Sequence, residues 1–244
     1  FLMTFDGARP VASISVVRYA ETFGFLGFYI VHPDYRGQGI GFALWQAGMA
    51  QLADRAIALD GVVDQQENYK RSGFVWNGRN VRFVGRSGFE LSHSFDGVLR
   101  TAEHSDWKAI RHLDDKCFGV PRETFLRRWL YAGDGVRRFS LVAQNAGDSL
   151  DGFVTWRTCR SGFKIGPLFA ADDTTASALL AGAAEQIGAD EEITLDVPER
   201  YANAVHLAES AGMKPVFETA RMVLGVAPQV AWDQVYGLTS FELG

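Results

Sequence analysis

Apolar and polar positions divide the chain into strand-like runs, turns and helix-like stretches. Alternation from Leu2 to Gly7 and from Val11 to Arg18 predicts two strands joined by a hairpin. An apolar run, Phe28-Tyr29-Ile30-Val31, predicts a further strand, and a helical pattern follows a short Gly-rich segment. In that helical pattern the apolar residues form one stripe, which we expect to face the core: Phe42, Trp45, Met49 and Leu52.

The plan of the first half recurs in the second half at a nearly constant spacing. Leu2 and Leu141 each begin a strand-like run, and the interval between them also separates Arg18 from Arg157. Nearly the same interval separates Asp60 from Asp196, which end apolar runs in Leu-Asp pairs. We therefore interpret the chain as two copies of one α/β plan, each a mixed sheet flanked by helices.

Each copy is expected to close with a hairpin, at 74–84 around Asn77-Gly78 and at 215–224. Polar, Gly- and Ser-rich residues at 85–94 are typical of a linker. This stretch predicts the domain boundary, which divides the chain into domains at 1–90 and 91–244.

An additional segment at 96–138 precedes the second copy, and we call it the preamble. We expect it to form a short strand at 98–100 and helices at 106–117 and 122–131. The first copy has no counterpart of this preamble. We therefore expect the first domain to lack its N-terminal strand and helices, about 45 residues.

Composition and charge exclude several kinds of protein for this chain. The chain has 244 residues, 47% of them hydrophobic, which suits one large domain or two of ordinary size. A formal net charge of −5 without a basic tract argues against nucleic-acid binding. No apolar run approaches the roughly 20 residues of a membrane span, and no secretory signal is visible. Cys117 and Cys159 lack metal-ligand spacing and are too few for a disulfide framework. We expect a cytoplasmic protein without a metal.

The segment Arg36-Gly37-Gln38-Gly39-Ile40-Gly41 lies between the strand ending at Val31 and the helical pattern that begins near Phe42. Glycine lets a backbone turn sharply and approach a ligand closely. The N–H groups at a helix start, aligned with the helix dipole, bind anions such as phosphate. The segment lacks both the lysine of a P-loop and the glycine spacing of a dinucleotide-binding loop. It therefore predicts a site for another phosphorylated cofactor, to which Arg36 adds positive charge.

The second copy lacks these features. It has Ala171-Asp172-Asp173-Thr174-Thr175 in place of the Gly-rich loop, so two carboxylates stand where the first copy has a positive site. Tyr69, four residues before Gly73, has Ala208 as its counterpart. We therefore expect the phosphate site in the first domain.

The loop at 36–41 and the segment Asn68-Tyr69-Lys70-Arg71-Ser72-Gly73-Phe74 resemble the GNAT superfamily of acyltransferases. The second half resembles the companion domain of two-domain, YitI-like GNAT proteins at 165–170, 195–198, 220–222 and 236–244. This resemblance implies tandem GNAT domains, each with a mixed, mostly antiparallel, twisted sheet. It also implies that the second domain is degenerate and lacks the CoA phosphate loop.

The resemblance implies acetyl-CoA as the co-substrate. The pantetheine arm is implied to pair with the strand at Tyr29, Ile30 and Val31, with the Val31 N–H polarising the thioester carbonyl. The other implied cofactor-binding residues belong to the loop and the helix start: Arg36, Gly37, Gln38, Gly39, Ile40, Gly41 and Phe42. Tyr69 is implied to protonate the departing thiolate.

Asp60 is the first candidate for the base that accepts the proton of the attacking amine. It ends the strand expected to diverge from the strand at Val31. Asp196 holds the matching place in the copy without the loop, so a shared structural role, such as capping a turn, is the alternative. His32 titrates in a suitable range but directly precedes Pro33, which also suits a solvent-facing strand end.

The predicted function is therefore that of an N-acetyltransferase. It would move an acetyl group from acetyl-CoA directly to the amine of a small molecule. Two alternatives stay open, a non-catalytic acyl-CoA-binding regulatory protein and an O- or peptide-acyltransferase. A homodimer is compatible with all three predictions, and we expect neither nucleic acid nor membrane as a partner.

Overall fold

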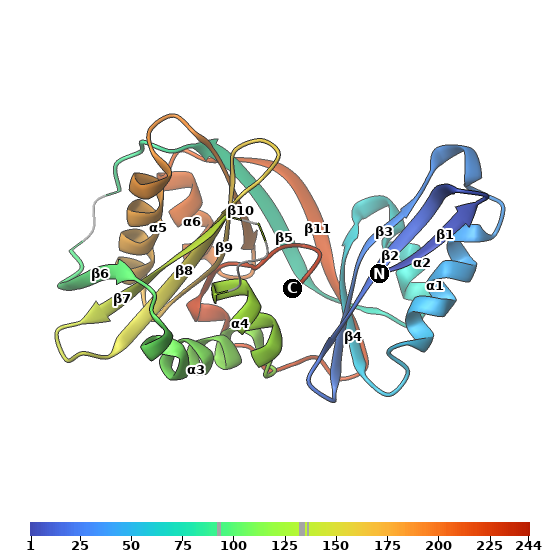
Figure 1. Ribbon diagram of the computed structural model, residues 1–244, viewed down its shortest axis with the longest axis horizontal. Coiled ribbons are helices and arrows are strands. Elements are labelled where there is room, and N and C mark those ends of the chain that lie inside the picture. Colours follow the sequence, from blue (N-terminus) through green and yellow to red (C-terminus); the bar gives the residue numbers. More distant parts are fainter. Residues whose placement is uncertain (92–93, 132–134, 136) are drawn as a thin grey trace. The chain divides into compact units, whose positions relative to one another are not determined.

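The computed structural model describes residues 1–91, 94–131, 135 and 137–244, so part of the predicted linker, residues 92 and 93, lies outside the described residues. The chain forms two compact units, whose elements are labelled in Figure 1. Unit 1 comprises Phe1–Asn77, Thr219–Ala227 and Phe241–Gly244. Unit 2 comprises Gly78–Glu218 and Pro228–Ser240.

Unit 1 is a sheet with the strand order β1-β2-β3-β4-β11. Its strands are β1 (Leu2–Asp6), β2 (Arg9–Tyr19), β3 (Phe23–Val31), β4 (Ala56–Val62) and the part of β11 (Lys214–Leu224) that begins at Thr219. Its helical segments are η1 (Pro33–Tyr35), α1 (Ile40–Ala50), η2 (Val63–Gln65) and α2 (Gln66–Arg71).

The core of unit 1 lies between the sheet and α1. Strand side chains alternate between the two faces of a sheet, so Ile14 and Leu26 point to the face that α1 covers. Trp45 and Leu52 join that cluster, as predicted for the apolar stripe. Phe42 does not, because it lies on the flank of the buried helix face, and 62% of its surface is exposed. The stripe prediction is therefore wrong for Phe42.

Unit 2 is a sheet with the order β5-β10-β9-β8-β7-β6, in which β12 also pairs with β9. Its strands are β5 (Val75–Arg86), β6 (Gly97–Thr101), β7 (Arg138–Asn145), β8 (Leu150–Thr158), β9 (Phe163–Ala170), β10 (Glu192–Pro198) and β12 (Val235–Gly237). Its helical segments are η3 (His104–Asp106), α3 (Trp107–Phe118), α4 (Glu123–Tyr131), α5 (Asp173–Ile187), α6 (Ala202–Ser210) and η4 (Trp232–Gln234).

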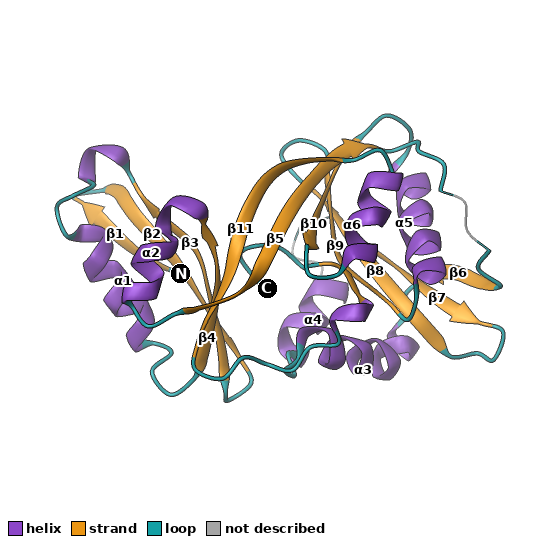
Figure 2. Cartoon of the chain, turned by 180° about the vertical axis from the view of Figure 1, so that it is seen from behind, coloured by secondary structure: helices purple, strands orange, loops and turns teal. Residues whose placement is uncertain are grey.

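Helices flank the unit 2 sheet (Figure 2). Residues of α5 and α6 share one core cluster with Leu141, Val154 and Ile165 of the sheet. The helices α3 and α4 contact β7, β8 and β9. The strand β6 and the helices α3 and α4 confirm the predicted preamble of the second copy. Helix α3 follows a capping box between Glu103 and Asp106, which satisfies backbone N–H groups at the helix start.

The predicted hairpins at 74–84 and 215–224 are wrong, because β5 and β11 are each one continuous strand. The strand β5 pairs with β10 of the other repeat, at Asn80–Arg86 in the register. The strand β11 pairs with β4, from Thr219↔Val62 to Leu224↔Ile57. Each last strand thus obtains backbone hydrogen bonds from the other repeat.

The two units confirm the predicted fold class. Among the described residues, the sheet of each unit has one parallel pair of neighbours, β3 with β4 and β9 with β10. The other pairs in the two strand orders given above, and the pair of β12 with β9, are antiparallel. Both units are therefore mixed, mostly antiparallel sheets flanked by helices.

Candidate active site

The Gly-rich loop joins β3 to α1, which confirms the predicted order of strand, loop and helix. Gly37 and Gly39 have φ angles of 74° and 79°, a left-handed conformation that glycine adopts without strain. A Cβ atom at either position would meet nothing within 4 Å. Gly39 precedes α1, and no side chain caps this helix start. The first N–H groups of α1 are thus free of side-chain caps, which suits an anion.

Two side chains of the loop bind its own backbone. Arg36 is exposed and donates Nε to the Val31 carbonyl oxygen at 3.1 Å, and Gln38 donates Nε2 to the Asp34 carbonyl oxygen at 2.9 Å. These bonds hold the loop against the end of β3. The other predicted cofactor residues, Ile40, Gly41 and Phe42, form the first turn of α1.

The strand β3 carries a β-bulge just before the loop. In the register with β2, Ser15 lies opposite Gly27 and Ser13 lies opposite Ile30, so β3 has one extra residue in this stretch. Phe28 lies in the bulge with a φ of 47°, and the Ser13 hydroxyl donates to its carbonyl oxygen at 3.1 Å. A bulge of this kind redirects the backbone groups that follow it.

The pairing of β3 with β4 ends just before the bulge. Their parallel pairing ends at Leu26↔Leu59, whereas β3 continues to Val31. The His32 N–H donates to the Val11 carbonyl oxygen on the β2 side at 2.9 Å, so alternation directs the Val31 N–H toward the β4 side. An extended group placed in this opening can therefore pair with β3 as an added strand.

Tyr69 lies in an aromatic cluster beside this opening. The centroid of its ring is 5.4 Å from that of Trp45 and 6.4 Å from that of Phe74. The ring centroids of Trp45 and Tyr29 are 5.5 Å apart. Burial, and secondarily the charge of Tyr29, raise the pKa of Tyr69 to about 12. The Tyr69 hydroxyl is therefore protonated at neutral pH and able to donate a proton.

Two glycines let the backbone approach this cluster. A Cβ atom at Gly61 of β4 would be 2.6 Å from Cε2 of Tyr69. A Cβ atom at Gly41 of α1 would be 2.9 Å from the Tyr29 hydroxyl and 2.8 Å from Cγ2 of Val31. The structure thus brings Tyr29, Val31 and Gly41 together with Tyr69.

Asp60 lies on the other face of the sheet from Tyr69, because neighbouring residues of β4 point to opposite faces. Its side chain is buried and binds Arg221 of β11 at two points, at 2.8 and 2.9 Å. Sequence reasoning missed Arg221 as part of this region. Its signal was the repeat spacing itself, which makes Arg221 the counterpart of Arg82 in the first copy.

His32 is bound at both ring nitrogens. Its Nε2 lies 2.9 Å from Nη2 of Arg9, and its Nδ1 accepts from the Asp34 N–H at 3.4 Å.

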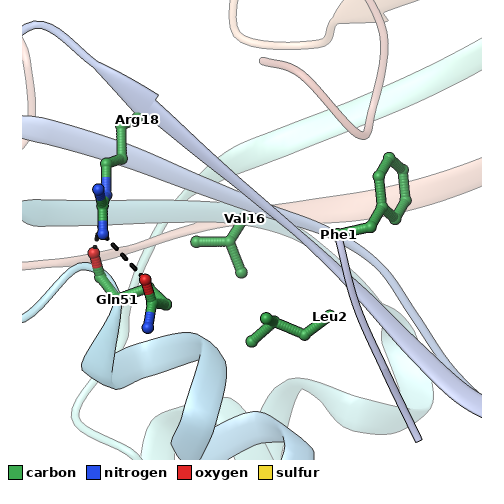
Figure 3. A pocket seen from close by; sticks show the side chains of 5 residues that line it. All are labelled: Phe1, Leu2, Val16, Arg18 and Gln51. Atoms are coloured by element: carbon green, nitrogen blue, oxygen red, sulfur yellow. Dashed lines mark hydrogen bonds between the residues drawn. The ribbon is translucent and has the colours of Figure 1, made fainter.

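A cavity of about 310 Å³ elsewhere in unit 1 is lined by Phe1, Leu2, Val16, Arg18 and Gln51 (Figure 3). There Arg18 donates to the Gln51 carbonyl oxygen at 3.1 Å and to its side-chain oxygen at 3.0 Å.

In unit 2 the corresponding opening is filled by the chain itself. The strands β9 and β10 are paired up to Ile165↔Leu195, and β12 then pairs with β9. The Leu238 N–H donates to the Asp196 carbonyl oxygen of β10 at 2.8 Å. The segment around β12 therefore lies where an extended ligand would lie between diverging strands.

The start of α5 in unit 2 is also occupied. Asp172 caps the helix by accepting from the Thr175 N–H at 2.8 Å. Asp173 accepts from the Tyr236 hydroxyl at 2.5 Å and from Nδ2 of Asn203 at 2.8 Å. Because the Asp172 carboxylate already binds a backbone N–H group of this helix start, an anion is disfavoured here.

The described part of the chain contains neither a membrane-spanning helix nor a metal-ligand cluster. None of their helices is long and apolar enough to cross a membrane. Within the same part of the chain, no group of three or more His, Cys, Asp or Glu side chains is arranged to hold a metal ion. Cys117 and Cys159 are not linked by a disulfide.

The sequence matches known acyltransferases along its whole length. Residues 110–237 match a family model described as an acetyltransferase (GNAT) domain, and residues 1–74 match the acetyltransferase (GNAT) family. Holothin acyltransferase from Pseudoalteromonas sp. (strain SANK 73390) is 32% identical over 245 aligned residues, which cover 100% of this chain and 81% of the relative.

Solved structures share the fold. A putative acetyltransferase from Pyrococcus horikoshii has a TM-score of 0.78 at 24% identity, covering 97% of this chain and 77% of that one. A tandem GNAT protein from the clavulanic acid biosynthesis pathway has a TM-score of 0.65 at 14% identity, covering 92% and 82% of the two chains. These two likenesses concern the fold alone.

Proposed function

Because this chain belongs to the GNAT family of acyltransferases, we propose that unit 1 binds acetyl-CoA and transfers its acetyl group to the amine of a small molecule. One observation carries the proposal. The strand β3 runs past its last pairing with β4, presents the Val31 N–H to the opening, and leads directly into the glycine loop at the start of α1. An extended arm and a terminal phosphate group are the two parts of a ligand that this layout fits.

Three parts of acetyl-CoA have proposed partners. The pyrophosphate binds the first N–H groups of α1 and the charge of Arg36, and Gly37 and Gly39 leave open space around the loop. The pantetheine arm pairs with β3 at Tyr29, Ile30 and Val31. The Val31 N–H then stabilises the negative charge that develops on the thioester oxygen.

Tyr69 is the proposed general acid. The amine nitrogen attacks the thioester carbon, so a C–N bond forms and the C–S bond breaks. The departing sulfur takes the proton of the Tyr69 hydroxyl, which its raised pKa keeps in place at neutral pH. The proton lost by the amine leaves through water, and the phenolate regains a proton from solvent.

The geometry favours the structural alternative for Asp60. Both carboxylate oxygens of Asp60 already accept hydrogen bonds from the Arg221 guanidinium. Asp60 also lies on the sheet face opposite to Tyr69. We therefore propose that Asp60 orders the site and does not remove the amine proton.

The second domain has a different proposed role. Because its opening is filled by β12 and its helix start by Asp172, we propose that unit 2 binds no acyl-CoA. The name of the relative, holothin acyltransferase, supports transfer of an acyl group to a defined acceptor. A cytoplasmic location belongs to the proposal as well.

The test is an acetyl-transfer assay. The chain is incubated with acetyl-CoA and a panel of small amines that includes holothin, and free CoA thiol and acetylated product are both measured. The proposal predicts product with at least one amine, and a large loss of rate in Tyr69→Phe with acetyl-CoA binding retained. Binding of acetyl-CoA without product on any amine would instead support the regulatory alternative. Product only with longer acyl-CoA donors would overturn the acetyl assignment.

A further inference from the structure

In each unit, an arginine of one repeat binds a buried aspartate of the other repeat. In unit 1, Arg221 donates Nε and Nη2 to the two carboxylate oxygens of Asp60, at 2.8 and 2.9 Å. In unit 2, Arg82 donates the same two atoms to Asp196, at 2.7 and 3.0 Å. The repeat spacing makes Arg82 and Arg221 counterparts. Each repeat therefore supplies the arginine that binds the carboxylate of the other repeat.

The pair in unit 1 lies at the point where β3 and β4 diverge. Asp60 directly follows Leu59, the last residue of β4 that pairs with β3. Its partner Arg221 lies opposite it in the register of β4 with β11. The Arg221 guanidinium also lies over the ring of Phe25 on β3, 5.0 Å from its centroid. Arg221 thus contacts both strands at the start of the opening.

The surroundings of the two pairs differ. Phe25 of β3 corresponds by the repeat spacing to Lys164 of β9, and Lys164 binds Asp196 at 2.6 Å. Asp196 therefore keeps a cationic partner when Arg82 is removed. The corresponding place beside Asp60 holds Phe25, on whose ring the Arg221 guanidinium packs.

From this geometry we propose that Arg221 is a positioning residue of the acyl-transfer site in unit 1. The inference rests on the proposed function. Arg221 fixes β4 to β11 and its guanidinium packs on β3, so it sets the spacing of the two strands between which the pantetheine arm lies. A methionine at position 221 can make neither hydrogen bond to Asp60, so the strands would lose the side chain that holds them at this spacing. The active site of the first repeat accordingly depends on the last strand of the second.

The test compares Arg221→Met with the matched variant Arg82→Met, and uses Arg221→Lys as a milder change that keeps the charge. Acetyl-CoA affinity is measured by isothermal titration, and folding is checked by circular dichroism. Hydrogen exchange of peptides covering β3 and β4 is measured without ligand. We expect Arg221→Met to weaken acetyl-CoA binding by about tenfold or more, and Arg82→Met to change it by less than about twofold. Hydrogen exchange of the β3 and β4 peptides is expected to be faster than in the parent for Arg221→Met and unchanged for Arg82→Met.

Several results would overturn the inference. One is parent-like binding and exchange in both Arg221 variants. Another is an equal loss of affinity in Arg82→Met, which would show a general effect on folding. If Arg221→Met does not fold, an unchanged affinity in Arg221→Lys counts against the inference and a partial loss supports it. If the parent binds no acetyl-CoA, the proposed function fails, and the exchange comparison alone decides the role of Arg221.

Discussion

Gly61→Ala is expected to move Tyr69 away from the opening. The new Cβ atom would lie 2.6 and 2.7 Å from Cε2 and Cδ2 of Tyr69, and 3.1 Å from Cδ1 of Leu59. Carbon atoms in contact are about 3.5–4.0 Å apart, so the ring must move by about 1 Å. Displacements of about 1 Å in a catalytic arrangement cost on the order of a hundredfold in rate. Overpacking of this kind costs about 1–3 kcal/mol of stability.

The assay is the rate of CoA thiol release with the amine found in the acceptor screen. We expect Gly61→Ala to lower this rate by about a hundredfold while the protein remains folded. Gly147→Ala is the control, because its Cβ atom would have one neighbour, at an ordinary 3.4 Å. In a Tyr69→Phe background, Gly61→Ala should add little, since both changes act through the same hydroxyl. A full rate in Gly61→Ala, or losses that simply add, would refute this reasoning.

Two further predictions concern ionisation and packing. The pKa of Tyr69 is about 12 in the folded protein and about 10 in the unfolded chain. Between pH 10 and pH 12 the folded protein therefore keeps a proton that the unfolded chain loses. The free energy of unfolding should therefore fall as the pH rises from about 10 to about 12, and fall less in Tyr69→Phe; equal slopes in denaturant titrations would contradict this. Gly27→Ala would place a Cβ atom 2.7 Å from the Glu242 carbonyl oxygen. The free energy of unfolding should therefore fall by about 1–3 kcal/mol, measured in the same denaturant titrations. An unfolding midpoint equal to that of the parent would show that the segment 241–244 does not pack against β3.

The sequence predicts the elements whose signals are local. Alternation placed β1 and β2, and the helix patterns of the second-copy preamble placed α3 and α4. The glycines at 37 and 39 indicated a loop before a helix, because positive φ angles favour glycine. The acids at 172 and 173 indicated that the second helix start differs from the first, and both accept hydrogen bonds there.

The sequence does not predict features that depend on distant partners. Asn77-Gly78 has the composition of a turn, but β5 runs without a break from Val75 to Arg86 and pairs with β10 from Asn80 onward. The sequence of the first copy alone makes Asp60 a candidate base. Arg221 reaches Asp60 only through the pairing of β4 with β11, which that sequence does not reveal. The segment around β12 carries no local signal of filling the opening of unit 2. In each case the deciding partner lies far away along the chain, beyond the reach of a local pattern.

The most direct test of the account is a titration of acetyl-CoA into the parent chain and into an Arg36→Ala, Gly39→Asp variant. Asp173→Asn, which changes the helix start of unit 2, is the control. The account predicts one acetyl-CoA per chain in the parent and in Asp173→Asn, and loss of binding in the loop variant. Undiminished binding in the loop variant, or two acetyl-CoA molecules per chain, would contradict it.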